Sequence, residues 1–76
     1  MNEKIRDVLL VTAGMRVAYM DEYDKISIPN GVAGEAQIGV AISEAVDTFL
    51  AKEDRDEPFD LYIEEFIAKE FPRGIK

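Results

Sequence analysis

The chain has 76 residues and a mass of 8.6 kDa, which is enough for one small domain and leaves too little interior for two. Apolar residues make up 47% of the chain and charged residues 33%, with a formal net charge of −7, so we expect an acidic protein that nevertheless folds. The absence of cysteine and histidine excludes a disulfide framework, a thiolate nucleophile, a histidine base and the usual zinc sites.

The first segment of the chain is compatible with two structures. In one, a helix runs from Asn2 to about Glu22, and its predicted buried side consists of Ile5, Val8, Leu9, Thr12, Met15, Tyr19 and Met20. That helix leaves Leu10 and Val17 among polar residues, and Gly14 interrupts it. In the alternative, the helix ends near Gly14 and a short β-hairpin forms at about 16–28, where apolar residues alternate as they do in strands.

The middle segment predicts a helix at about 35–52. It follows a turn signal, Pro29-Asn30-Gly31, which predicts a loop that also contains Gly34. The apolar residues recur at intervals of three and four: Ile38, Ala41, Ile42, Ala45, Val46, Phe49 and Leu50. Polar residues cluster on the opposite side, so this helix is expected to bury one face.

The last segment predicts a helix at about 57–71. Its apolar face consists of Phe59, Tyr62, Ile63, Phe66, Ile67 and Phe71. Pro58 suits the first turn of a helix, where its missing N–H costs nothing, and Pro72 discourages any continuation. The sequence therefore predicts a single all-α domain of three helices, or an α+β domain if the hairpin forms.

Acidic residues are concentrated in the second half of the chain. Residues 44–65 carry two basic residues, Lys52 and Arg55, against nine acids: Glu44, Asp47, Glu53, Asp54, Asp56, Glu57, Asp60, Glu64 and Glu65. Such a surface speeds association with a basic partner and repels nucleic acid. It is equally typical of a face that only keeps a small protein in solution.

The sequence predicts no catalytic, cofactor or metal site. Acid–base catalysis by a carboxyl group needs a desolvated Asp or Glu, and none falls within the apolar faces of the predicted helices. The hydroxyl residues lack a histidine base. The glycines at 31, 34 and 39 match no phosphate-binding motif. We therefore expect no enzyme activity and no cofactor.

These observations favour a non-enzymatic protein-interaction module that acts as a small acidic subunit or an inhibitor. We expect the protein to be cytoplasmic and to form a homo-oligomer. The cytoplasmic expectation rests on the lack of a long apolar run or a signal-peptide pattern. The predicted partner-binding residues are Glu53, Asp54, Asp56, Glu57, Leu61, Tyr62 and Glu65. The alternative is an acidic mimic of nucleic acid that occupies the basic groove of a DNA- or RNA-handling protein. Because the nine basic residues are scattered, no direct contact with nucleic acid or a membrane is expected.

Overall fold

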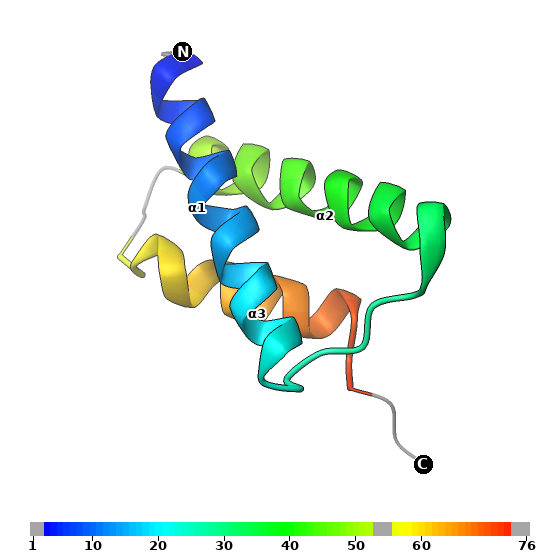
Figure 1. Ribbon diagram of the computed structural model, residues 1–76. Helices are drawn as coiled ribbons and strands as arrows, with labels where there is room; N and C mark the ends of the chain where they lie inside the picture. The colour runs from blue at the N-terminus through cyan, green and yellow to red at the C-terminus, as the bar shows by residue number, and fades with distance from the viewer. Residues whose placement is uncertain (1–2, 53–55, 74–76) are drawn as a thin grey trace.

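The computed structural model describes residues 3–52 and 56–73, and within these ranges the protein is a domain of three helices. Helix α1 spans Glu3–Glu22, α2 spans Gly31–Ala51 and α3 spans Phe59–Glu70. Each helix packs against the other two, and α1 crosses both of its neighbours (Figure 1). The predicted all-α fold is confirmed.

The alternative hairpin at residues 16–28 is wrong. Residues 16–22 continue α1, which ends in a left-handed turn at Asp24, with φ 61°. The Lys25 N–H donates to the Met20 carbonyl at 2.8 Å, the pattern that closes many helix C-termini. Ile26 then forms an isolated antiparallel bridge with Pro72. The segment after α1 is therefore tied to the end of α3 and does not pair with α1.

The two later helices differ from their predicted boundaries at the N-terminal ends. Helix α2 begins at Gly31, four residues before the predicted start, after an extended Asn30 at the N-cap position. Gly34 therefore lies in the first turn of α2, where it is buried. Helix α3 begins at Phe59, and Pro58 occupies the extended N-cap position instead of the first turn.

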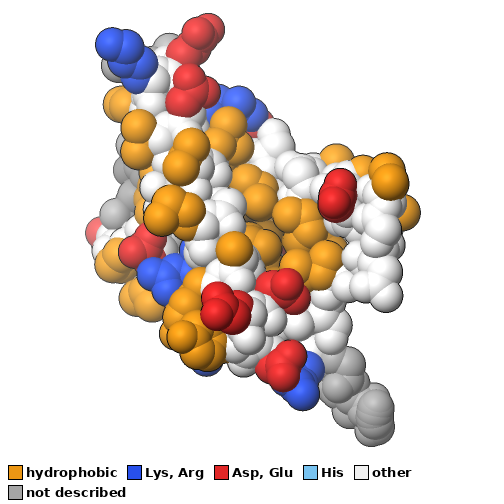
Figure 2. All heavy atoms as spheres, viewed as in Figure 1, with side chains coloured by type: hydrophobic (Ala, Val, Ile, Leu, Met, Phe, Trp, Pro, Cys, Tyr) orange, Lys and Arg blue, Asp and Glu red, His pale blue; other side chains and the backbone are white. Residues whose placement is uncertain are grey.

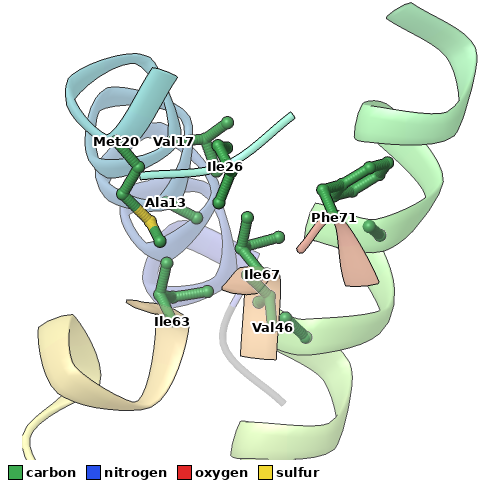
Figure 3. Packing of buried hydrophobic residues seen from close by; sticks show 10 residues of the cluster. Ala13, Val17, Met20, Ile26, Val46, Ile63, Ile67 and Phe71 are labelled. Carbon is green, nitrogen blue, oxygen red and sulfur yellow. The ribbon is translucent and has the colours of Figure 1, made fainter. Parts of the chain in front are cut away.

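The core lies where the three helices meet. Figure 3 shows Ile63 and Ile67 of α3 pointing toward α1 and α2, and Val46 of α2 beside them. These three side chains are fully buried. The other buried apolar residues are Ala13, Val17, Met20, Ile26, Ala41, Ala45 and Phe71. The apolar faces predicted for α2 and α3 thus supply the core, as expected.

The face predicted to be buried on α1 is largely wrong. Of the predicted set, Met20 is buried and Leu9 packs against the core, but Ile5, Val8, Met15 and Tyr19 are exposed. Val17, which was expected on the polar side, is 4% exposed. Helix α1 therefore has a second apolar face, which is exposed to solvent.

Two arginines of α1 form ion pairs with the other two helices. The Arg6 guanidinium donates to the Asp47 carboxylate of α2 at 2.8 Å, and the Arg16 guanidinium lies 3.0 Å from the Glu64 carboxylate of α3. The hydrogen bond from Arg6, together with its charge, holds the pKa of Asp47 below its usual value. These ion pairs and the buried Ala13 lie on the side of α1 that faces α2 and α3.

Candidate functional site

Helix α1 carries the main uncovered apolar surface of the described chain. We call it the α1 apolar stripe and define it as Ile5, Val8, Val11, Met15, Tyr19 and Tyr23. These residues follow one another at intervals of three or four, so they lie on one side of the helix and its last turn. Their exposed fractions run from 41% for Tyr19 to 68% for Met15. Figure 2 shows hydrophobic side chains along the length of α1.

Two shallow hollows lie along the stripe. A shallow hollow of about 340 Å³ is lined by Thr12, Met15, Arg16, Tyr19 and Asp60. A second, of about 280 Å³, is lined by Asp7, Val8, Val11 and Thr12. The rings of Tyr19 and Tyr23 lie 4.7 Å apart, and the Arg16 guanidinium lies 5.1 Å from the centre of the Tyr19 ring. Both hollows are open to solvent along α1, and the Tyr19 ring borders the first of them.

The centre of the stripe is nearly free of charge. From Val8 to Met20 the chain contains one charged residue, Arg16. The Arg16 side chain pairs with two carboxylates of α3, at 3.0 Å from Glu64 and 3.5 Å from Asp60. A partner that covers this surface would therefore desolvate apolar groups and few ions.

The described residues of the predicted partner-binding set belong to α3 and the segment before it, and none of them is a member of the stripe. Glu53 and Asp54 lie outside the described residues. Asp56 is exposed, and Leu61 is 51% exposed on the outer side of α3. Their role in binding stays a prediction.

Tyr62 is a half-buried member of this predicted set, and the two members that remain are Glu57 and Glu65. The Tyr62 ring lies 5.3 Å from the Phe49 ring, and the Lys52 ammonium lies 4.9 Å from the centre of the Tyr62 ring. Burial raises the pKa of Tyr62, a hydrogen bond with Thr48 opposes the rise, and the charge of Glu57 adds to it. The end of α2 and the start of α3 are therefore joined by an aromatic cluster under the acidic surface.

Glu57 and Glu65 come together at this surface. Loss of hydration raises the pKa of Glu57, the hydrogen bond and the charge of Glu65 raise it further, and Lys52 partly offsets the rise. The charged form of Glu57 is therefore disfavoured by its loss of hydration and by the neighbouring Glu65. Sequence analysis placed both residues in one predicted set but could not show that they are paired.

This pair gives a pH-dependent stability with a defined sign. Because the pKa of Glu57 is raised in the folded state, its stabilising contribution is present below the usual glutamate value of about 4.3 and is lost as the pH rises through the raised value. Glu65→Gln should therefore increase the melting temperature near pH 7, and the increase should vanish near pH 3. Thermal unfolding followed by circular dichroism at both pH values tests this.

The control for that experiment is Glu44→Gln, which removes one exposed carboxylate from α2. It produces the same change in net charge without touching the Glu57–Glu65 pair. A melting temperature of Glu65→Gln at or below that of the wild type at pH 7 contradicts the pairing.

Other kinds of site find little support among the described residues. Over residues 3–52 and 56–73, no polar or charged side chain is buried. No group of three or more Asp and Glu side chains in these ranges gathers as a metal site requires. None of the three described helices is both long enough and apolar enough to cross a bilayer. Comparison with protein-family models, curated proteins and solved structures finds no match.

The sequence pattern predicts four of the six residues of the α1 apolar stripe to be in the core, so it does not predict the stripe. The signal that could have revealed it is the run Val8–Met20. Thirteen residues with one charge supply more apolar surface than one helix face can bury in a three-helix domain.

Proposed function

We propose that the chain is a non-enzymatic protein-interaction module that binds a protein partner through the α1 apolar stripe. The observation that carries the proposal is the exposure of six large apolar side chains along one side of one helix. Covering apolar surface contributes about 25 cal/mol per Å². Continuous patches of this kind are typical of interaction sites. A domain of this size also has a small core and gains stability from a partner.

The proposal also includes the cellular compartment and the kinds of molecule that the protein does not contact. We propose a cytoplasmic protein, acting as a subunit or an inhibitor, without direct contact with nucleic acid or a membrane surface. A net charge of −7 repels phosphates and anionic lipids alike.

The acidic surface supports the alternative function less well. A mimic of nucleic acid needs carboxylates that are available to a basic groove. Asp47, Asp60 and Glu64 are instead engaged by arginines of α1. The stripe has no comparable internal partner, so it carries the proposal.

A photo-crosslinking amino acid placed at Val11 tests the proposed function in cells of the native host. The matched control is the same probe at Val40 of α2, because the two valines are 63% and 61% exposed. We expect a defined crosslinked protein product from the Val11 probe and none above background from the Val40 probe. Equal products from the two positions, or none from either, would contradict the proposal.

A further inference from the structure

We propose that the α1 apolar stripe binds the same stripe of a second copy of this chain, with the two α1 helices antiparallel. The result is a dimer with twofold symmetry, in which one surface serves both subunits. This inference rests on the proposed function and names the partner of that surface.

The exposed area of the stripe is comparable to half of a small dimer interface. Six side chains that are each 41–68% exposed, together with their flanking residues, leave roughly 600 Å² uncovered per copy. Two copies would then bury roughly 1,200 Å² in total, the lower bound for a stable specific interface. The α1 stripe therefore reaches the size of a small specific interface when its whole length is covered.

Charge is the second argument. Two molecules with a net charge of −7 repel each other, so they can associate only where carboxylates are few. The stretch Val8–Met20 contains no carboxylate, and its single charge, Arg16, is paired with α3. A basic partner would instead be drawn to the acidic side of α2 and α3. The composition of the stripe thus favours a second copy.

The ends of α1 determine the orientation. Lys4 and Glu22 are eighteen residues apart, which is five helical turns, so both lie on the side of the stripe. In an antiparallel pair each Lys4 faces Glu22 of the second copy, and the helix dipoles also oppose each other favourably. A parallel pair would place like charges together at both ends. Charge complementarity therefore selects the antiparallel arrangement.

The same register fits the shape of the stripe. Pairing Lys4 with Glu22 puts the symmetry axis at the level of residue 13, so Val11 lies opposite Met15 of the second copy. Tyr19 of the second copy then lies at the level of Asp7 and Val8, which line the hollow of about 280 Å³. Apolar residues at positions 5, 8, 11, 15 and 19 also follow one another at the three- and four-residue spacing of paired helices.

Sedimentation equilibrium of the full chain over a wide range of concentration tests the dimer. We expect the wild type to approach twice the chain mass of 8.6 kDa. Val11→Glu should weaken association by at least about 50-fold, because it buries two carboxylates near the symmetry axis. Val40→Glu, which changes the same residue type at matched exposure, should weaken it less than about twofold. Met15→Glu is a second disrupting variant, and circular dichroism verifies that each variant stays helical.

A charge exchange tests the orientation. Lys4→Glu and Glu22→Lys should each weaken the dimer by about fivefold, and the double variant should restore wild-type association. Lys4 and Glu22 are about 27 Å apart along one helix, so restoration can arise only between two chains. Single variants that associate like the wild type would overturn the antiparallel arrangement.

The outcomes separate this inference from the proposed function. A chain that stays monomeric at all concentrations, while the Val11 probe captures a different protein, overturns the dimer and supports the interaction module. A dimer that survives both Val11→Glu and Met15→Glu overturns the α1 interface. A monomer with no product from the Val11 probe overturns both proposals.

Discussion

Replacing Ile63 with alanine should remove most of the free energy of unfolding of the protein at room temperature. The Ile63 side chain is fully buried where α3 meets the other two helices. Removing a buried isoleucine side chain to alanine costs about 2–5 kcal/mol, through lost burial and the cavity left behind. A single core of this size supplies only about 3–5 kcal/mol of net stability. Urea unfolding followed by circular dichroism measures the loss.

Leu61→Ala is the matched control for this prediction. Leu61 lies two positions away in the same helix, has a side chain of similar size and is 51% exposed. We expect its free energy of unfolding to fall by less than about 1 kcal/mol. If the two variants lose equal stability, the core does not lie where the helices cross.

The fold could be predicted from the sequence where apolar and polar residues separate clearly. In α2 and α3, positions such as Ala45, Val46, Ile63 and Ile67 recur at helical spacing and are buried in the structure. Polar residues occupy the opposite faces, so only one rotation of each helix buries its apolar side. Periodicity therefore fixes both the type and the orientation of these two elements.

The orientation of α1 could not be predicted in the same way. Apolar residues surround most of this helix, so many rotations bury a similar apolar area. The observed rotation brings together residues that are distant in sequence, such as Arg6 with Asp47 and Arg16 with Glu64. It also buries Ala13 where the helices cross. The face of α1 that stays uncovered is the α1 apolar stripe.

The predicted partner-binding set, which is mostly acidic, shows a second limit of prediction from the sequence. The sequence groups Glu57 and Glu65 by their place in an acidic stretch and Tyr62 by its place beside an apolar helix face, and their role in binding stays a prediction. Composition alone could not separate a binding surface from an ordinary solvated one. The structure adds that three nearby acids, Asp47, Asp60 and Glu64, pair with arginines.

Gly34 is a case where a turn residue and a packing residue look the same in sequence. The neighbouring Pro29-Asn30-Gly31 motif predicts a loop, and a loop tolerates glycine for its flexibility. In the structure Gly34 is helical and buried in the first turn of α2, and a Cβ atom there would overlap the Pro29 carbonyl group. The glycine is required by this close approach of backbone to backbone.

Gly34→Ala should therefore destabilise the protein, although alanine favours helix. An overlap with backbone atoms cannot be relieved by turning a side chain, so either Pro29 moves away or the first turn of α2 unwinds. Forcing an extra methyl group into a closely packed site costs about 1–3 kcal/mol. Urea unfolding should show this loss, and amide hydrogen exchange should increase first in residues 31–35.

Gly39→Ala is the control in the same helix, and it should have the opposite sign. Nothing lies within 4 Å of a Cβ added at Gly39, so the alanine meets open space. Replacing a glycine inside a helix with alanine then stabilises it by about 0.5–1 kcal/mol, because the unfolded chain loses conformational freedom. A common sign for the two variants would show that helix propensity, and not the contact with Pro29, governs both positions. Opposite signs would show that the close approach of Pro29 decides the effect at Gly34.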